Sequence, residues 1–222
     1  MDISVAVIGG GSWGTTVAHL AAHQVPTVLW ARRSELAAEI NEQHSNERYL
    51  PGYKLHPALR STTDLAEAVE QADVIVMGVP SQGFRSALEL VAPHVRAVQG
   101  TIVNVSSIAG QIPLPWLPLY SATKFALASL TSTQRIELRR DGVHVMGVFP
   151  GYVDTGFQDN AAGSKPPDNV IKGKKYAVSA TECAEAIVKG MEARRHTVVT
   201  PKAGIVPVIL ARLFPAFFES RF

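Results

Sequence analysis

Tyr120 and Lys124 are the two side chains whose types and spacing most clearly suggest chemistry. They lie four residues apart in a segment of helical composition, so on a helix they project from the same face. A free tyrosine has a pKa of about 10, too high for ready proton exchange at neutral pH. A neighbouring ammonium group favours the phenolate and lowers that pKa. The spacing predicts a general acid/base pair, although Tyr-x-x-x-Lys also arises by chance on many helices.

Ser107 follows the apolar run Thr101 to Val105, which is typical of a strand. A hydroxyl at the end of a strand can hydrogen-bond a substrate carbonyl and orient it. A serine at a strand end is also commonly a turn residue or a cap. Both interpretations of Ser107 stay open on the residues alone.

A glycine-rich turn stands near the start of the chain, after the apolar run Ile3 to Ile8 and before a helical segment that begins at Ser12. The pattern G-x-G-x-x-G is formed by Gly9, Gly11 and Gly14. The first glycine permits the tight turn, the second lets the backbone approach a pyrophosphate, and the third lets helix and strand pack closely. The free N–H groups of the helix N-terminus favour a bound anion. The alternative is a plain tight turn without a ligand.

Arginines stand where the choice between the two nicotinamide dinucleotides is usually made. An acidic residue after the second strand holds the ribose 2′-hydroxyl of NAD. Here that strand, Thr27 to Trp30, is followed by Ala31, Arg32 and Arg33. Two guanidinium groups suit a 2′-phosphate, because they stay charged and donate paired hydrogen bonds. The sequence favours NADP, and a solvated arginine pair is the alternative.

These residues are set in a regular alternation of strand-like and helix-like segments. Strands are expected at 3–8, 27–30, 74–79, 101–105 and 143–149, and helices at 12–23, 34–43, 64–71, 81–96 and 122–139. Such alternation predicts an α/β fold with a doubly wound parallel sheet and helices on both faces, in three layers. Residues 1–222 suit a single Rossmann domain, made of a dinucleotide-binding half (1–98) and a catalytic half (99–222).

Composition excludes several other classes of protein. Charges nearly balance at +2, which argues against a nucleic-acid partner. The single cysteine, Cys183, excludes an internal disulfide and favours a cytoplasmic location. His19 and His23 alone have metal-like spacing, but a packed or solvated helix face is the better interpretation, and no metal is expected. The tail, residues 203–222, is expected to pack in the core or a homo-oligomer; weak membrane-surface contact through 203–218 or a substrate lid are the alternatives.

Up to about Arg96 the chain resembles the amino-terminal half of bacterial glycerol-3-phosphate dehydrogenases. The resemblance rests on VAVIGGGSWGTTVA, VLWARR, RYLPGY and ADVIVMGVPSQGFR. It implies NADP contacts at Ser12, Trp13, Arg32, Arg33 and Tyr49. That family continues with a lysine-glycine stretch and an all-helical domain carrying the catalytic lysine, and neither is present in this sequence.

From about Gly100 onward the chain resembles short-chain dehydrogenases instead. The matching segments are IVNVSS at 102–107, YSATK at 120–124 and PGYVDT at 150–155. The resemblance implies that Ser107 rather than Ser106 is catalytic, with Tyr120 and Lys124, and that Lys124 also reaches the nicotinamide ribose. It further implies that Pro150 and Gly151 frame the nicotinamide, with Val153 and Thr155 near its carboxamide.

Both resemblances have departures. The short-chain family opens with Thr-Gly-x-x-x-Gly-x-Gly and carries Asn-Asn-Ala-Gly after its fourth strand, where this chain has GGGSWG and MGVPSQG. The family's proton-relay asparagine is expected near Ser81 to Phe84, where only Gln82 offers an amide. We infer a recombinant of two Rossmann families, joined between about Arg96 and Thr101. Such an exchange can preserve the topology, because the β-α-β connections of both parents wind in the same hand.

The function that these observations favour is an NADP-dependent oxidoreductase that interconverts a small-molecule carbonyl and an alcohol. Tyr120 would transfer the proton, Lys124 would tune it, and Ser107 would hold the substrate oxygen. One alternative is a glycerol-3-phosphate dehydrogenase, which activity on dihydroxyacetone phosphate would reveal. The other is a cofactor-binding scaffold without catalysis, which the missing asparagine favours.

Overall fold

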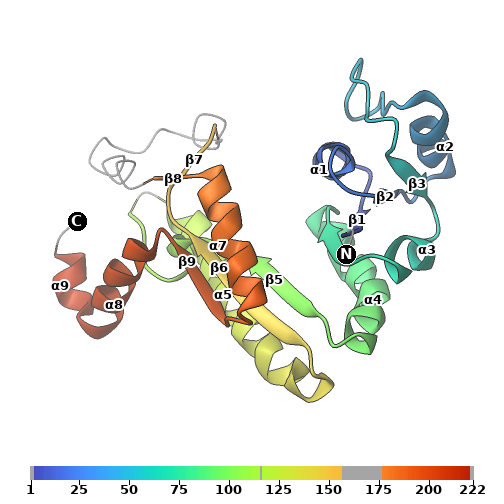
Figure 1. Cartoon of the computed structure of the whole chain (residues 1–222). Helices are drawn as coiled ribbons and strands as arrows, with labels where there is room; N and C mark the ends of the chain where they lie inside the picture. Colours follow the sequence, from blue (N-terminus) through green and yellow to red (C-terminus); the bar gives the residue numbers. More distant parts are fainter. Residues whose placement is uncertain (1–2, 116, 157–176, 221–222) are drawn as a thin grey trace. The chain divides into compact units, whose positions relative to one another are not determined.

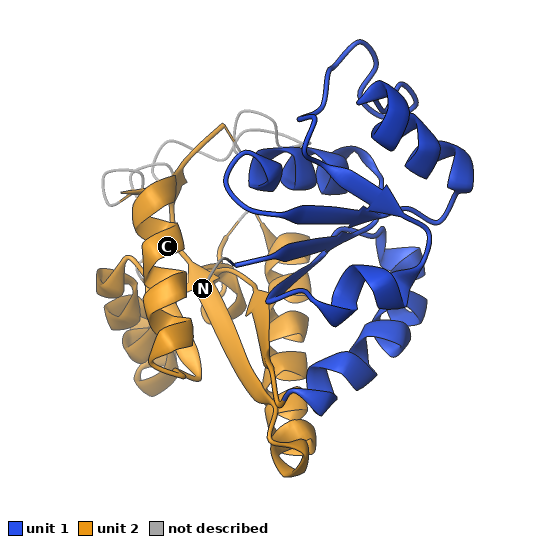
Figure 2. Ribbon diagram, turned by 45° about the vertical axis from the view of Figure 1, so that its right-hand side comes forward, with its two compact units in different colours: residues 1–98 blue, residues 99–222 orange. Residues whose placement is uncertain are grey.

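The chain forms two compact units in the computed structural model, which describes residues 3–115, 117–156 and 177–220. The units are residues 1–98 and 99–222 (Figure 2). Hydrogen bonds join the strands into a four-stranded parallel sheet, a three-stranded parallel sheet and a two-stranded pair. Helices flank the sheets (Figure 1), which confirms the predicted α/β class with parallel strands. The assignment of all 222 residues to one domain stays a prediction.

Unit 1 alternates strands and helices from its first strand to its last helix. Its sheet has the strand order β3-β2-β1-β4, with β1 at the centre of the parallel pairings. Its elements are β1 (Val5–Ile8), α1 (Ser12–Ala22), β2 (Thr27–Trp30), α2 (Ser34–Gln43), β3 (Arg60–Thr62), α3 (Leu65–Glu70), β4 (Val74–Met77) and α4 (Ser81–Ala97).

Alternate residues of β1 serve two separate cores, one on each face of the sheet. Val7 packs with α1 and α2 through Ala18 and Ile40. Ala6 and Ile8 belong to the other cluster, which includes residues of α3 and α4. Successive side chains of a strand point to opposite faces, so the apolar sequence of β1 requires helices on both sides. Unit 1 is therefore doubly wound, as the sequence predicted.

Unit 2 is built around the long strand β6, which pairs with β5 on one side and β9 on the other. Its described elements are β5 (Thr101–Val105), the 3-10 turn η1 (Ile108–Gly110), α5 (Pro118–Glu137), η2 (Leu138–Asp141), β6 (His144–Pro150), β7 (Val153–Asp154), β8 (Val178–Ser179), α7 (Ala180–Glu192), β9 (Thr197–Thr200), η4 (Lys202–Gly204), α8 (Ile205–Leu213) and α9 (Pro215–Glu219).

The two faces of β6 carry different helices. Met146 and Val148 pack with Val198 of β9 and with Ile187 of α7. The opposite side meets α5, because a Cβ on Gly147 would lie 3.3 Å from Thr131 Cγ2. Figure 1 shows α7 and α5 on opposite sides of this sheet. The sheet therefore holds α5, the helix that carries Tyr120 and Lys124.

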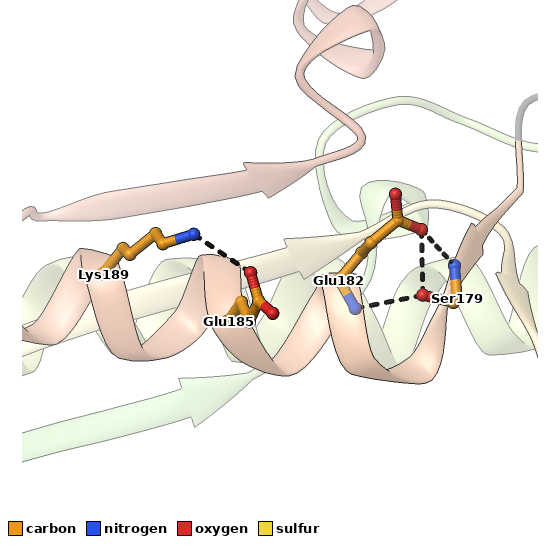
Figure 3. A network of polar contacts seen from close by, with 4 residues as sticks. All are labelled: Ser179, Glu182, Glu185 and Lys189. Atoms are coloured by element: carbon orange, nitrogen blue, oxygen red, sulfur yellow. Dashed lines mark hydrogen bonds and ion pairs between the residues drawn. The ribbon is translucent and has the colours of Figure 1, made fainter.

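Helix α7 begins with a reciprocal capping box (Figure 3). The backbone N–H of Glu182 donates to Ser179 Oγ at 3.1 Å, and Ser179 N–H donates to Glu182 Oε2 at 2.8 Å. The hydrogen bonds that the Ser179 N–H and hydroxyl donate to the Glu182 carboxylate lower the pKa of this carboxyl group. One turn further on, Lys189 pairs with Glu185 at 3.0 Å, but both side chains are mostly exposed. The cap therefore stabilises α7 more than the exposed ion pair does.

The carboxyl-terminal segment folds back onto the loop after β5. Val208 of α8 and Phe218 of α9 are buried against Ile112, in agreement with the expected packing role. The outer side of the segment is apolar and exposed at Ile209 and Leu213. None of the described helices is long and apolar enough to cross a membrane.

Several predicted boundaries need correction. Ser34, the first residue of the expected helix at 34–43, is also of a type that commonly caps a helix, but Arg33 occupies the N-cap position of α2 and no side chain caps the amides. Asp64 does cap α3, accepting from the amides of Ala66 and Glu67. Helix α4 continues through Pro93 to Ala97, and α5 begins at Pro118, four residues before the expected start. Proline is well tolerated in a first helical turn, which explains the earlier start of α5.

Three histidines of unit 1 lie against one another. The rings of His19 and His23 are 4.8 Å apart, and those of His23 and His56 are 4.3 Å apart. His19 is buried, and its Nδ1 accepts a hydrogen bond from the His56 N–H at 2.9 Å. His19 is thus packed and His23 exposed, which together fit the expected packed or solvated helix face. Among the described residues there is no group of three or more potential metal ligands. Burial, followed by the proximity of His23 and His56, lowers the pKa of His19.

This lowered pKa predicts a loss of stability on acidification. Below about pH 6.5 the unfolded chain takes up a proton at His19 that the folded chain resists, so unfolding is favoured as pH falls toward the folded pKa. We expect the melting temperature to fall between pH 7.5 and 5.5. His19→Asn keeps an acceptor for the His56 amide and should flatten this dependence, measured by circular dichroism. An unchanged slope in His19→Asn, with His94→Asn as the control, would contradict the assignment.

Candidate functional site

The glycine turn of unit 1 depends on three close backbone approaches. Gly9 has a φ of +122°, and a Cβ there would lie 2.7 Å from the carbonyl oxygen of Gly78. A Cβ on Gly14 would lie 2.0 Å from the carbonyl oxygen of Gly9. A Cβ on Gly78 would lie 3.0 Å from the Cα of Gly14. Only glycine fits these positions, so the ends of β1 and β4 meet the first turn of α1 at backbone distance.

Gly11 differs from its neighbours, because space is open around it. No atom lies within 4 Å of the position that a Cβ would occupy, apart from its chain neighbours and its helix's own backbone. Gly11 is the N-cap of α1, and no side chain caps the first amides of that helix. Free amides at a helix N-terminus, with room for a ligand to approach, match the requirements of a phosphate site. The arrangement fits a dinucleotide pyrophosphate.

The loop between α2 and β3 covers the turn and holds it in place. Ser12 Oγ donates to the Tyr49 carbonyl oxygen at 3.2 Å. Asn46 is fully buried, and its Nδ2 donates to the Gly10 carbonyl oxygen at 3.1 Å and to Thr15 Oγ1 at 2.9 Å. Sequence analysis missed both Asn46 and Gly78. Nothing local marks them, because their partners lie far away along the chain.

The aromatic and basic residues expected near the cofactor are accessible. Trp13 is 59% exposed and Tyr49 is 40% exposed. Arg32 is exposed and Arg33 is half-exposed, and neither forms an ion pair within the described ranges. Their charges are therefore available to an anionic ligand.

Ser106 and Ser107, at the end of β5, have different roles. Ser106 is buried, and its hydroxyl donates to the Lys124 carbonyl oxygen at 3.1 Å, so it fastens the strand end to α5. Ser107 is half-buried, accepts from the Ala109 N–H at 3.2 Å and donates weakly to the Pro150 carbonyl oxygen at 3.4 Å. A long hydrogen bond is readily exchanged for one to a ligand. Of the two serines, Ser107 has the hydroxyl that can turn toward a substrate.

Tyr120 and Lys124 lie on the first two turns of α5. The Lys124 Nζ atom is 5.5 Å from the centre of the Tyr120 ring. Lys124 is half-buried and forms no ion pair in the part of the chain that the structure describes. Burial lowers the pKa of Lys124. An ammonium group without a carboxylate partner can direct its charge to the phenol and to a ligand.

A close backbone approach also places helix α5. A Cβ on Gly110 in η1 would lie 2.5 Å from the Lys124 carbonyl oxygen. The turn after Ser107 thus packs directly on the helix turn that carries Lys124. Next to Tyr120, the hydroxyl of Ser121 is buried and has no hydrogen-bond partner among the described residues.

The remaining expected cofactor residues follow β6. Pro150 ends that strand beside Ser107, and the Gly151 N–H donates to the Thr200 carbonyl oxygen at 2.7 Å. Val153 pairs with Val178 in the two-stranded sheet, and Thr155 is exposed. The structure thus brings Ser107 and Pro150 together. The content of glycine, proline, asparagine, aspartate and lysine in residues 152–175 predicts a loop, and positions 157–175 of it lie outside the described residues.

Gln82, the one amide near the expected relay asparagine, lies in the first turn of α4 with an exposed side chain. It makes no hydrogen bond to another described residue beyond the helix backbone. No described contact therefore gives Gln82 the role of that asparagine.

Two family models match the sequence, and they overlap. Residues 4–108 match the NAD-dependent glycerol-3-phosphate dehydrogenase N-terminus, and residues 69–165 match the short chain dehydrogenases. The junction that we infer, at about 96–101, lies within the stretch that both models match. The transition between the two resemblances is therefore not abrupt.

Curated relatives are glycerol-3-phosphate dehydrogenases. One from Sphingopyxis alaskensis is 42% identical over 153 residues, which cover 68% of this chain and 40% of the relative. One from Mycobacterium avium is 46% identical over 121 residues, covering 54% of this chain and 30% of the relative. The chain spans well under half the length of these relatives. A match over 153 residues also extends beyond the first unit, which ends at residue 98.

Solved structures show the fold. A short chain dehydrogenase from Burkholderia cenocepacia in complex with NADP has a TM-score of 0.62 at 17% identity, covering 99% of this chain and 97% of that one. One from Burkholderia phymatum in complex with NAD has a TM-score of 0.59 at 20% identity, covering 97% and 95%.

The fold is thus of the Rossmann type. The chain is a mixed dehydrogenase-like protein, similar over residues 4–108 to the N-terminus of NAD-dependent glycerol-3-phosphate dehydrogenases and over residues 69–165 to short chain dehydrogenases.

Proposed function

We propose that the chain is an NADP-dependent oxidoreductase that interconverts a carbonyl and an alcohol. The observation that carries the proposal is the half-buried Lys124 ammonium, which lies 5.5 Å from the Tyr120 ring and has no described carboxylate partner. A structural lysine would be expected to point to solvent or to pair with an acid. Here its charge favours the phenolate that a proton-transferring tyrosine must form.

The residues of unit 1 suit the dinucleotide. The open space at Gly11 and the free amides of α1 would hold the pyrophosphate, and Arg32 and Arg33 would hold a 2′-phosphate. Bound NADPH supplies a hydride to the carbonyl carbon.

The residues of unit 2 would handle the proton and the oxygen. Ser107 would donate a hydrogen bond to the substrate oxygen and orient it. Tyr120 would give its phenolic proton to that oxygen as the carbon accepts the hydride, which yields a neutral alcohol. Lys124 would stabilise the phenolate left behind until a proton returns from solvent. In the oxidative direction the same groups act in reverse.

A second candidate is reduction of dihydroxyacetone phosphate, as in glycerol-3-phosphate dehydrogenases. The 42% identity to the Sphingopyxis alaskensis relative favours it, although the chain covers only 40% of that protein. Turnover of dihydroxyacetone phosphate that survives Tyr120→Phe would select this function. Turnover of other carbonyls that depends on Tyr120 would select the first.

The glycines offer a test of the phosphate site with a matched control. In Gly11→Ala the new methyl enters open space, so we expect an unchanged melting temperature and at least tenfold weaker NADPH binding by fluorescence titration. In Gly14→Ala the methyl would meet the Gly9 carbonyl oxygen, so we expect a lowered melting temperature. Full NADPH affinity in Gly11→Ala would show that the turn does not bind the cofactor.

The arginines predict the choice of dinucleotide. A doubly charged 2′-phosphate gains more from guanidinium groups than a 2′-hydroxyl does. Arg32→Ser combined with Arg33→Ser should weaken NADPH binding at least tenfold and change NADH binding less than threefold. Equal losses for the two dinucleotides would contradict this specificity, and Arg60→Ser is the exposed control on β3.

The catalytic residues predict a contrast between neighbouring serines. Tyr120→Phe should lower carbonyl turnover at least a hundredfold while NADPH still binds, because the proton donor alone is lost. Ser107→Ala should lower turnover tenfold or more and lower the melting temperature only slightly, through loss of its cap on η1, whereas Ser106→Ala should mainly lower the melting temperature. Steady-state NADPH oxidation measures the first effect and thermal melts measure the second. Turnover unchanged in Tyr120→Phe would overturn the proposal.

A further inference from the structure

A basic groove lies in unit 2, at the end of the sheet where β6 begins. It has a volume of about 740 Å³ and is formed where the end of α5, η2, the first residues of β6 and the turn before β9 meet. The lining residues are Arg135, Ile136, Glu137, Arg139, Arg140, Gly142, Val143, His144, Val145, Arg194 and His196. The expected catalytic residues belong to other places: Tyr120 and Lys124 to the first turns of α5, and Ser107 to the loop after β5.

The charge of this groove is unbalanced. Four arginines line it against one glutamate, which gives a formal lining charge of +3 with the histidines neutral. Including the neighbouring Asp141, Glu192 and Arg195 still leaves +2. This local charge equals the formal charge of the whole chain. None of the lining arginines forms an ion pair within the described residues.

Helix ends do not account for so much positive charge. The end of α5 and the end of α7 both lie here, and each helix C-terminus carries about half a negative charge. Together these two ends could balance about one arginine. Set against the net charge of +2 counted above, they leave a surplus of about +1 for a ligand.

Two arginines are held in defined positions. Arg135 Nε donates to the Val145 carbonyl oxygen at 3.1 Å, and its NH2 group donates to the His196 carbonyl oxygen at 2.7 Å. This guanidinium therefore links the backbone of β6 to the residue that precedes β9. Arg194 adopts a left-handed backbone with a φ of +46°, a conformation that favours glycine or asparagine. The left-handed residue caps the end of α7, because the Arg194 N–H donates to the Met191 carbonyl oxygen and the Arg195 N–H to the Gly190 carbonyl oxygen, both at 2.9 Å. This cap fixes the backbone from which the Arg194 side chain extends.

We propose that this groove binds a small molecule that carries a chain of phosphates. Guanidinium groups pair with phosphate oxygens through two parallel hydrogen bonds, and several of them around one groove suit an anion of three or more charges. The volume lies in the range of small-molecule sites. An extended polyanion would require a larger basic surface than a chain of net charge +2 provides.

The test is titration of the full chain with sodium tripolyphosphate by isothermal calorimetry. We expect saturable binding that weakens at least tenfold in the Arg139→Gln, Arg140→Gln double variant and in Arg194→Gly. The left-handed backbone at position 194 suits glycine, so the Arg194→Gly variant removes the guanidinium without disturbing the fold. Arg194→Lys, which keeps a charge, should retain part of the affinity.

Controls separate the groove from the cofactor turn. Arg85→Gln, on the exposed side of α4, should bind tripolyphosphate like the unmodified chain. Gly11→Ala changes the other candidate phosphate site, so it should leave unchanged the share of the binding that the groove variants lose. If Gly11→Ala lost the binding and the groove variants kept it, the phosphates would occupy the α1 turn and the groove proposal would be wrong.

Other ligands test which class of anion the groove binds. Orthophosphate should bind at least tenfold more weakly than tripolyphosphate, because it meets fewer guanidinium groups. Equal affinity for both, or no saturable binding of tripolyphosphate at millimolar concentration, would overturn the proposal. Binding of a single-stranded oligonucleotide or of anionic vesicles through the same arginines, without tripolyphosphate binding, would contradict the small-molecule class.

Discussion

The approach of backbone to backbone around Gly9, Gly14 and Gly78 is the constraint on which the first unit depends. A carbonyl oxygen or a Cα stands where each of these residues would carry a side chain, at 2.0 to 3.0 Å. Because no methyl group fits, β1, β4 and α1 can meet at one point, and the amides of α1 face open space at Gly11. Burial of β1 on both faces holds the strand that ends in this turn. The same packing that stabilises the unit therefore creates its candidate phosphate site.

Unit 2 uses a related device at its own candidate site. Gly110 allows the turn after Ser107 to lie on the carbonyl of Lys124, and the hydroxyl of Ser106 donates to that same carbonyl. The strand end that presents Ser107 is thus fixed to the helix that presents Tyr120 and Lys124. Catalytic side chains need positions accurate to about an ångström, which rigid elements provide better than long loops.

Much of this could be predicted from sequence where a local pattern has one physical cause. The roles of Gly9 and Gly14 follow from a glycine pattern whose positions each carry a steric requirement, and the strand–helix alternation follows from hydrophobic periodicity. Gly78 and Asn46 could not be predicted in this way, because their contacts join segments distant in the chain. The basic groove was hidden for the same reason: its arginines come from two separate arginine pairs and from Arg135, and only the fold brings them together.

The central claim, that a dinucleotide served by unit 1 reduces a carbonyl held by Ser107 and Tyr120, is tested most directly by isotope transfer. The chain would be incubated with NADPH carrying deuterium at the transferable position and with a carbonyl that it turns over, and the alcohol would be analysed by mass spectrometry. The account predicts one deuterium on the carbinol carbon for each NADPH oxidised, from one face of the nicotinamide only. Saturable NADPH binding without deuterium in any alcohol would contradict it.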